Sequence, residues 1–143
     1  MLAILRILKT KGSHVATLKP DNTVLDGLKL MAEKNIGAIM VVDDEKLVGV
    51  FTERDYARKI ILMDRASKET SLAEIMTQLV HFVSPQASVD ECLQLMTNKF
   101  IRHLPVLENG KLVGVVSIGD LVKMKMEDQQ IAIDNLQNYI SGQ

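Results

Sequence analysis

The chain has 143 residues, of which 47% are hydrophobic and 3% aromatic, and its formal net charge is −1. This length suits one compact domain with an aliphatic core, and the balanced charge gives no field that would attract nucleic acid or an anionic membrane. The single cysteine excludes an internal disulfide and indicates a reducing, cytoplasmic location.

The chain opens with a short apolar stretch, MLAILRILKTKG. Met1, Ile4, Leu5 and Leu8 follow the i, i+3, i+4, i+7 spacing of one helical face, which predicts an amphipathic helix within a lead-in covering 1–14. Basic residues interrupt the stretch and no small-residue cleavage site follows, so a secretory signal is not indicated. The helix is expected to pack on the body of the protein or on a second subunit.

The rest of the chain contains an internal duplication. A shift of 65 residues aligns 18–55 with 83–120 without a gap, and 14 of the 38 pairs are identical. The motif KLVGV occurs at 46–50 and again at 111–115. This self-similarity indicates two copies of one supersecondary unit, each of which must bury its apolar face against the other.

Both copies predict the same order of elements, which is strand, helix, strand, strand and helix. A short extended segment (15–18 and 81–84) leads through a proline turn to a helix, for which Thr23 and Ser88 are the expected N-caps. Two short apolar runs around DDEK or ENGK predict a hairpin, and a polar helix follows. The apolar stripe of the first helix consists of Val24, Leu28 and Met31 in one copy and of Val89, Leu93 and Met96 in the other.

These elements predict an α/β (α+β) fold in which two β-α-β-β-α repeats pack about a pseudo-twofold axis. The expected boundaries are 15–66 for the first repeat and 71–126 for the second, which SLAEIMT at 71–77 begins. A C-terminal helical extension at 127–143 completes the chain.

The last helix is expected to run from about Ile118 to Ile140. It carries an apolar stripe interrupted by Gln129 and Gln130. Such a stripe on a projecting helix indicates a homodimer contact, and the alternative is that the helix folds back on its own body. The stripe consists of Val122, Met126, Ile133, Leu136 and Ile140.

Each hairpin ends in a hydroxyl residue that is followed three positions later by an aspartate. The pairs are Thr52 with Asp55 and Ser117 with Asp120. One interpretation is a capping box, in which the hydroxyl accepts a bond from the helix amide and the acid reaches back. This interpretation needs nothing but a helix start.

The first copy adds two arginines behind its hairpin, Arg54 and Arg58. A cation in the first helical turn is disfavoured by the helix dipole. A bound phosphate would reverse that balance, because the free amides and the guanidinium groups would all donate to it. The alternative is a solvated surface pair that Glu53 or Asp55 holds.

The two tandem units, each with a VGV strand, a Thr or Ser and an Asp three residues later, resemble a pair of cystathionine-β-synthase (CBS) domains, called a Bateman module. The motifs EIMT and IRHLPV add to the resemblance, which covers nearly the whole chain. It implies a regulatory module whose two clefts between the repeats bind adenosine-containing ligands such as AMP, ADP, ATP, NAD(H) or S-adenosylmethionine.

The resemblance also implies the site residues. In the family the Asp of this motif binds ribose, the hydroxyl residue helps at the phosphate, and the base lies against strand edges of the neighbouring copy. Main-chain groups of Ala16 and His81 would read the adenine edge, and Lys11 would reach a phosphate. The residues implied for the first cleft are Thr52, Arg54, Asp55, Arg58, His81, Ile101, Arg102 and His103. Those implied for the second cleft are Lys11, Ala16, Ile36, Gly37, Ala38, Ser117 and Asp120.

The two implied clefts differ in charge. The shift of 65 residues pairs Arg54 with Gly119, and it pairs Arg102 with Gly37. Cationic side chains therefore gather at the Asp55 cleft, which is expected to hold the tighter or more phosphate-rich ligand.

No set of catalytic residues is evident. Cys92 lies on an apolar helical stripe, which favours a packing role over a nucleophilic one. His14, His81 and His103 are scattered without zinc-ligand spacing, and neither GxxxxGKS nor GxGxxG occurs. We therefore expect no enzyme, no metal and no catalytic cofactor, and the expected partners are an adenosine ligand, a second copy and an unidentified regulated protein. The alternative is a ligand-free dimeric scaffold whose terminal helices form the functional surface.

Overall fold

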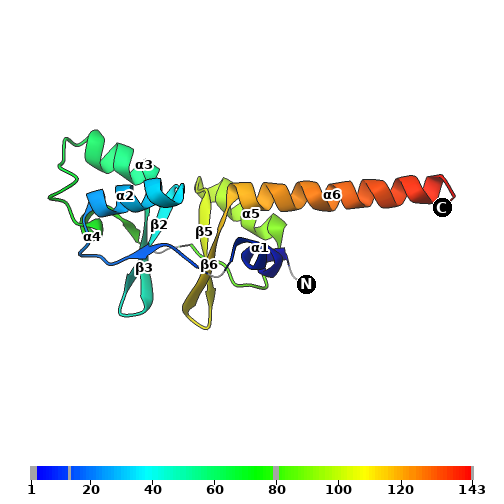
Figure 1. Ribbon diagram of the computed structural model, residues 1–143, viewed down its shortest axis with the longest axis horizontal. Helices are drawn as coiled ribbons and strands as arrows, with labels where there is room; N and C mark the ends of the chain where they lie inside the picture. Colours follow the sequence, from blue (N-terminus) through cyan, green and yellow to red (C-terminus); the bar gives the residue numbers. More distant parts are fainter. Residues whose placement is uncertain (1–2, 13, 79–80, 143) are drawn as a thin grey trace.

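The computed structural model describes residues 3–12, 14–78 and 81–142, so the predicted contribution of Met1 lies outside the described residues. Two halves lie side by side, each with a hairpin covered by helices, and the long last helix projects from the second half (Figure 1). The predicted α+β fold of two repeats is confirmed. In chain order the elements are α1 (Ala3–Lys11), β1 (Thr17–Leu18), α2 (Val24–Lys34), β2 (Ala38–Asp43), β3 (Lys46–Thr52), α3 (Glu53–Asp55), the π-helix η1 (Tyr56–Ile61), α4 (Leu72–Ile75), β4 (Thr77–Gln78), α5 (Val89–Lys99), β5 (His103–Glu108), β6 (Lys111–Ser117) and α6 (Ile118–Ile140).

The helices α2 and α5 begin and end in the same way. The side chains of Thr23 and Ser88 accept bonds from backbone amides of the first helical turn, which confirms both predicted N-caps. Each helix ends at a residue in the left-handed region, Asn35 with φ 53° and Phe100 with φ 56°. Because a large side chain at positive φ is uncommon, this shared ending shows how closely the second copy repeats the backbone of the first.

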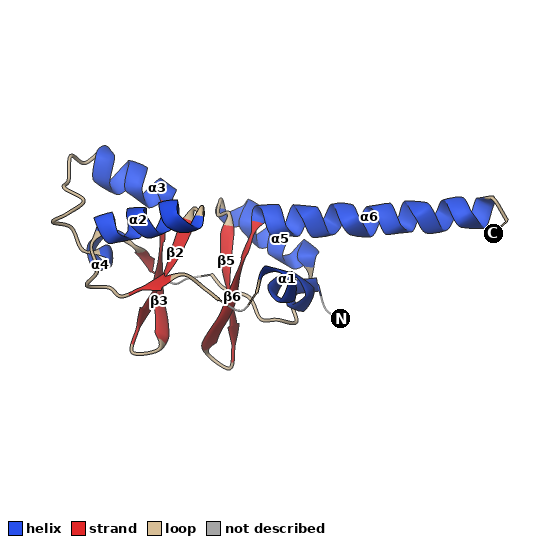
Figure 2. Cartoon of the chain, viewed as in Figure 1, coloured by secondary structure: helices blue, strands red, loops and turns tan. Residues whose placement is uncertain are grey.

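The strands form two sheets (Figure 2), a four-stranded sheet in the order β1-β2-β3-β4 and the β5-β6 hairpin. The hairpins share one register, since Ala38 lies opposite Thr52 and His103 lies opposite Ser117. The lead-in strands are shorter than expected. Only Thr17–Leu18 of the predicted 15–18 is a strand, and in 81–84 a single bridge joins Val83 to Val106.

The core has three parts, one in each half and one between the two hairpins. The cluster between the hairpins includes Ala38, Met40 and Leu47, with Val50 and Val115 packed against it. Both hairpins contribute to this cluster, so it fixes their relative position and with it the shape of any cleft between them.

The N-terminal helix and α4 play matching roles in opposite halves. Ile4 and Ile7 of α1 are buried in the core of the second half. Leu72 and Ile75, at the same spacing on α4, are buried in the core of the first half. The segment 71–77, where we expected the second repeat to begin, therefore packs on the first half. The predicted face of α1 was wrong in one residue, because Leu5 is exposed and Ile7 is buried in its place.

Two glycines reflect the same correspondence between α1 and α4. A Cβ atom at Gly114 would collide with Leu8, which lies four residues after Ile4. A Cβ atom at the equivalent Gly49 would collide with Met76, which lies four residues after Leu72. The VGV motif thus leaves room on each hairpin for one covering helix.

The helices that follow the two hairpins differ in length and form. After β3 the chain forms α3 and then η1, with i to i−5 bonds from Leu62 N to Ala57 O and from Arg65 N to Ile60 O, and it turns back toward α4. After β6 it continues as α6, which confirms the predicted helix from Ile118 to Ile140. Within the described residues, no helix is both long and apolar enough to cross a membrane.

Candidate functional site

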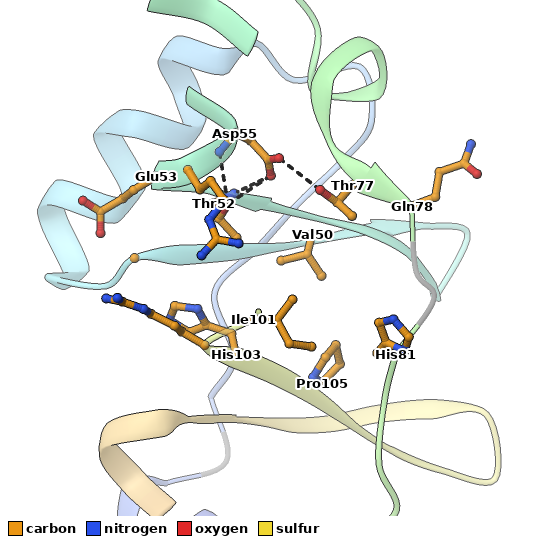
Figure 3. A pocket seen from close by; sticks show the side chains of 13 residues that line it. Val50, Thr52, Glu53, Asp55, Thr77, Gln78, His81, Ile101, His103 and Pro105 are labelled. Atoms are coloured by element: carbon orange, nitrogen blue, oxygen red, sulfur yellow. Dashed lines mark hydrogen bonds between the residues drawn. The ribbon is translucent and has the colours of Figure 1, made fainter. Parts of the chain in front are cut away.

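A pocket of about 470 Å³ lies between the two halves, next to the start of α3 (Figure 3). One wall comes from β3 and the residues after it, and the facing wall comes from the start of β5. Its lining combines apolar surface with ionisable groups, as is usual for small-molecule sites. The lining residues are Gly37, Val50, Thr52, Glu53, Arg54, Asp55, Thr77, Gln78, His81, Ile101, Arg102, His103 and Pro105.

The structure brings together seven of the eight residues implied for the Asp55 cleft. Arg58 is the exception, because its side chain is exposed on η1 and does not line the pocket. Gly37, which was implied for the other cleft, lies in this pocket instead, with Glu53 and His103 beside it. Most of the implied residues therefore line one pocket, and their role in binding a ligand stays a prediction.

Asp55 is 5% exposed and each of its carboxylate oxygens has two protein partners. Oδ2 accepts from the amide and the hydroxyl of Thr52 at 3.0 and 3.1 Å. Oδ1 accepts from the Thr77 hydroxyl at 3.0 Å and lies 3.0 Å from Lys59 Nζ. The capping-box interpretation is confirmed here, and a ligand that needs Oδ1 must compete with Thr77 and Lys59.

Thr77 and Lys59 are partners of Asp55 that the sequence did not reveal. Lys59 lies one helical turn after Asp55, a spacing that favours an ion pair and was a usable signal. It also donates to the carbonyl of Ile75 at 2.9 Å. Thr77 reaches Asp55 because β4 pairs with β3 through Gly49 and Val50, and no local pattern predicted that two-residue strand.

The charges of the ionisable groups at the mouth of the pocket do not sum to zero. The guanidinium of Arg54 donates to the carbonyl of Phe100, which joins the first half to the second. Arg102 is exposed at the opposite wall. Glu53 is the opposing charge, and Asp55 is already neutralised by Lys59. Two guanidinium groups and one carboxylate therefore face an incoming ligand.

His103 lies between the pocket and the Asp120 site. Burial lowers the pKa of its imidazole below the ordinary 6.5, and Lys11 and Arg102 lower it further against the opposing effect of Asp120 and Glu53. The folded protein therefore holds His103 neutral near pH 7.

This pKa predicts a pH dependence of stability. A depressed histidine pKa means that the unfolded chain binds more protons, so stability is lost as the pH falls from 6.5 toward the lowered value. We expect the His103→Gln variant to lose less stability than the wild type between pH 7.5 and 5.5, measured by urea unfolding. The wild type serves as the control for the carboxyl groups that titrate in both proteins, and equal losses would contradict the prediction.

At the second site, a lysine of the chain itself is bonded to the carboxylate of Asp120. Lys11 Nζ donates to Asp120 Oδ2 at 2.8 Å and to the Val115 carbonyl at 2.9 Å. The Ser117 amide donates to the same oxygen at 2.8 Å, which confirms the second capping box. Burial alone would raise the pKa of Asp120, but the bonds from Lys11 and Ser117 outweigh it and hold this pKa below its ordinary value.

The remaining residues implied for the Asp120 cleft are not joined to this network in the same way. Ala16 packs against the core of the first half, and its carbonyl accepts from Met40 N at 3.3 Å. Ala38 is buried in the cluster between the hairpins, and Ile36 is exposed. Of the implied set, the structure connects Lys11, Ser117 and Asp120.

Cys92 is fully buried in the core of the second half, as its place on the apolar stripe predicted. Burial raises the pKa of its thiol to about 11, so the reactive thiolate is not available at neutral pH. In the described ranges, no three or more His, Cys, Asp and Glu side chains gather in a way that could hold a metal ion.

Comparison with known proteins points to one family. The family model described as CBS domain matches residues 10–62 and 72–127. CBS domain-containing protein CBSX3 of Arabidopsis thaliana, mitochondrial by its name, is 41% identical over 145 residues, which cover 95% of this chain and 70% of the relative. A solved protein with CBS domains from Burkholderia ambifaria MC40-6 is 52% identical with a TM-score of 0.83, covering 88% of this chain and 93% of that one. A CBS-CP12 protein from bloom-forming cyanobacteria, described as hexameric, is 27% identical with a TM-score of 0.74, covering 85% and 66%.

Proposed function

Because the chain belongs to the family of tandem CBS-domain proteins, which are generally regulatory, nucleotide-binding modules, we propose that it binds an adenine nucleotide and thereby modulates a partner protein. The ligand is AMP, ADP, ATP or NAD(H), and it acts as an effector and not as a catalytic cofactor. The module works in the cytoplasm as a homodimer, without nucleic acid or membrane as a partner, and it catalyses no reaction of its own.

The pocket beside Asp55 is the observation that carries this proposal. Its volume of about 470 Å³ lies within the range of roughly 300 to 1,000 Å³ that holds small ligands. The side chains of Val50, Ile101 and Pro105 give it apolar surface of the kind that a flat purine base covers (Figure 3).

The charged groups of the pocket suit the polar end of the same ligand. Arg54 and Arg102 offer forked donors to phosphate oxygens from two sides. Asp55 would accept the ribose hydroxyls through Oδ1, after Thr77 and Lys59 release that oxygen. Glu53 repels phosphate, so the chain length of the phosphate group should matter strongly.

Both halves line the pocket, which gives a route from binding to regulation. A ligand held between Asp55 of the first half and Arg102 of the second would favour one relative position of the two. It changes the affinity for a partner only if it binds that position better than another.

A ligand-free interaction protein is the second candidate. The observation in its favour is that each aspartate already forms an ion pair with a lysine of the chain, Asp55 with Lys59 and Asp120 with Lys11. Both carboxylates are thus satisfied by the protein itself, as a fold that had lost its ligand would require.

Thermal unfolding with AMP, ADP, ATP, NADH and S-adenosylmethionine separates the two candidates. A ligand at a hundred times its dissociation constant adds about 2.7 kcal/mol of stability, which for a chain of this size raises the unfolding midpoint by roughly 5 to 10 °C. GTP is the matched control, because it shows whether the protein distinguishes adenine from another purine base. No shift with any adenosine ligand would reject the sensor and favour the interaction protein.

A further inference from the structure

An apolar seam runs along α6 from Val122 into the half that leaves the body, and its side chains are exposed in the described chain. Residues 127–140 are all exposed along a helix that projects away from both halves (Figure 1). An isolated helical segment of this length is marginal in water, so a projecting helix with large apolar side chains needs a partner. The seam side chains are Val122, Met126, Ile133, Leu136 and Ile140.

The seam follows the alternating spacing of a coiled coil. Successive seam positions, with Gln129 included, are separated by four, three, four, three and four residues. In heptad terms, isoleucine stands at a in Ile133 and Ile140 and leucine stands at d in Leu136, the combination that favours two parallel strands. Two chains of the same sequence can therefore bury identical faces against each other.

The seam side chains point away from the core of the second half, and Gln129 alone among them lines a groove with Arg6 of α1 and Asp90 of α5. Leu121 and Met124, which anchor α6 in the core of the second half, lie roughly 100° and 160° around the helix from the seam. Val122 extends the exposed seam back toward the body. A second helix can thus run along α6 from near its start to its end.

Gln129 decides the orientation. In a parallel pair it meets the Gln129 of the second copy, and the two amides can satisfy each other, which also fixes the register. In the antiparallel pair that keeps the same layers it would face Ile133, which leaves a buried amide without a partner at a cost of about 1 to 3 kcal/mol. The parallel arrangement is therefore favoured.

Charges beside the seam do not oppose this arrangement. The flanking positions beyond the body hold Gln130, Ala132, Gln137 and Tyr139. The acidic residues of the extension, Glu127, Asp128 and Asp134, fall at outer heptad positions, away from the second helix. Lys123 and Lys125 flank the start of the seam, but in a parallel pair they lie opposite Ile118 and Gln130 of the second copy, so these flanking positions bring no like charges together.

We propose that two copies of this chain dimerise through a parallel, in-register coiled coil of α6, with Gln129 as its polar layer. The inference deepens the homodimer part of the proposed function by naming its surface, and it does not depend on the nucleotide.

Two isoleucines of similar exposure test the seam. Ile133 lies on it and is 48% exposed, and Ile131 lies on the opposite side of α6 and is 55% exposed. We expect the wild type and Ile131→Asp to scatter light at about twice the chain mass of 15.9 kDa, and Ile133→Asp to scatter as a monomer. A monomeric wild type, or a dimer that survives Ile133→Asp, would overturn the proposal.

Disulfide trapping tests the orientation. Leu136→Cys places two thiols face to face only in the parallel pair, and the native Cys92 is buried and does not compete. We expect mild oxidation to link nearly all Leu136→Cys chains as dimers. Linkage only in a mixture of Met126→Cys and Leu136→Cys chains would show the antiparallel pair instead, and linkage of Ile131→Cys as readily as Leu136→Cys would show random collision.

The nucleotide experiment keeps this inference separate from the proposed function. The Ile133→Asp monomer should keep the full nucleotide-induced shift of the wild type, because the pocket is formed within one chain. A monomer without any shift, next to a dimer that shifts, would mean that the site needs both copies.

Discussion

Replacing Ile4 with alanine is expected to lower the free energy of unfolding by about 2 to 5 kcal/mol. Ile4 has no exposed surface and is part of the core of the second half. The substitution removes three carbons from a packed site, and the cavity that remains adds to the lost transfer energy. Urea unfolding, with the midpoint and the slope measured together, gives the difference.

Leu5→Ala is the matched control, since this neighbour on the same helix is 39% exposed. Its loss should stay below about 1 kcal/mol, as for other partly exposed apolar side chains. Equal effects of the two substitutions would mean that α1 is not docked on the second half as the structure shows. The comparison also asks whether the N-terminal helix belongs to the folded module or is only attached to it.

The docking of α1 has a consequence for the Asp120 site. Lys11 ends the helix that Ile4 anchors, and it donates to Asp120 and to the carbonyl of Val115. A ligand that takes Asp120 from Lys11 would remove one of the contacts that hold α1 against the body. The two sites therefore differ in what their occupation would disturb, because Lys59 at the Asp55 site belongs to the same helical segment as its partner.

Local chemistry explains what the sequence predicted well. Thr23, Ser88, Thr52 and Ser117 are helix caps whose signal lies within four residues of chain, and all four form the expected bonds. The hairpins could be predicted because two apolar runs separated by a few turn residues pair with each other locally. Features of this kind need no knowledge of the tertiary structure.

Long-range packing explains what the sequence did not reveal. The half on which α1 or α4 packs depends on the core that the helix fills. The apolar stripe of each helix does not identify that core. The two-residue strand β4 exists because Thr77 and Gln78 pair with Val50 and Gly49 of β3. The i to i−5 bonds of the π-helix after Asp55 were likewise not predicted by any local pattern in the sequence.

The candidate site shows the same division. The duplication paired Asp55 with Asp120 as capping residues, which the structure confirms, while the arginines beside Asp55 predicted that the two clefts differ. The structure also shows unequal surroundings, since Asp55 is buried beside a pocket whereas Asp120 is bonded by Lys11. The resemblance implied Arg58 for the pocket, but the chain continues from Tyr56 as a π-helix and the Arg58 side chain is exposed outside the pocket.

The unequal surroundings predict that Asp55→Asn lowers nucleotide affinity at least tenfold, whereas Asp120→Asn lowers it less than threefold. Hydrogen bonds to a charged group contribute about 1.5 to 3 kcal/mol, so losing the ribose contacts of the carboxylate costs roughly 10- to 100-fold in affinity. Both carboxylates already pair with a lysine, but Asp55 lines the pocket of about 470 Å³ and Asp120 does not, so a ligand bound in that pocket depends more on the charge of Asp55. Isothermal titration calorimetry with the nucleotide that gives the largest thermal shift measures both affinities.

Asparagine is chosen because its carbonyl oxygen can still accept the Thr52 amide, so the cap of α3 is kept while the charge is removed. Lys59 loses its counter-ion but stays hydrated, since its side chain is 43% exposed. The unfolding midpoint of each variant without ligand is the control for folding. A larger loss of affinity in Asp120→Asn than in Asp55→Asn would place the tighter site at Asp120. Unchanged affinity in both variants would show that neither carboxylate binds the ribose, and nucleotide binding would then depend on Arg54, Arg102 and the apolar walls alone.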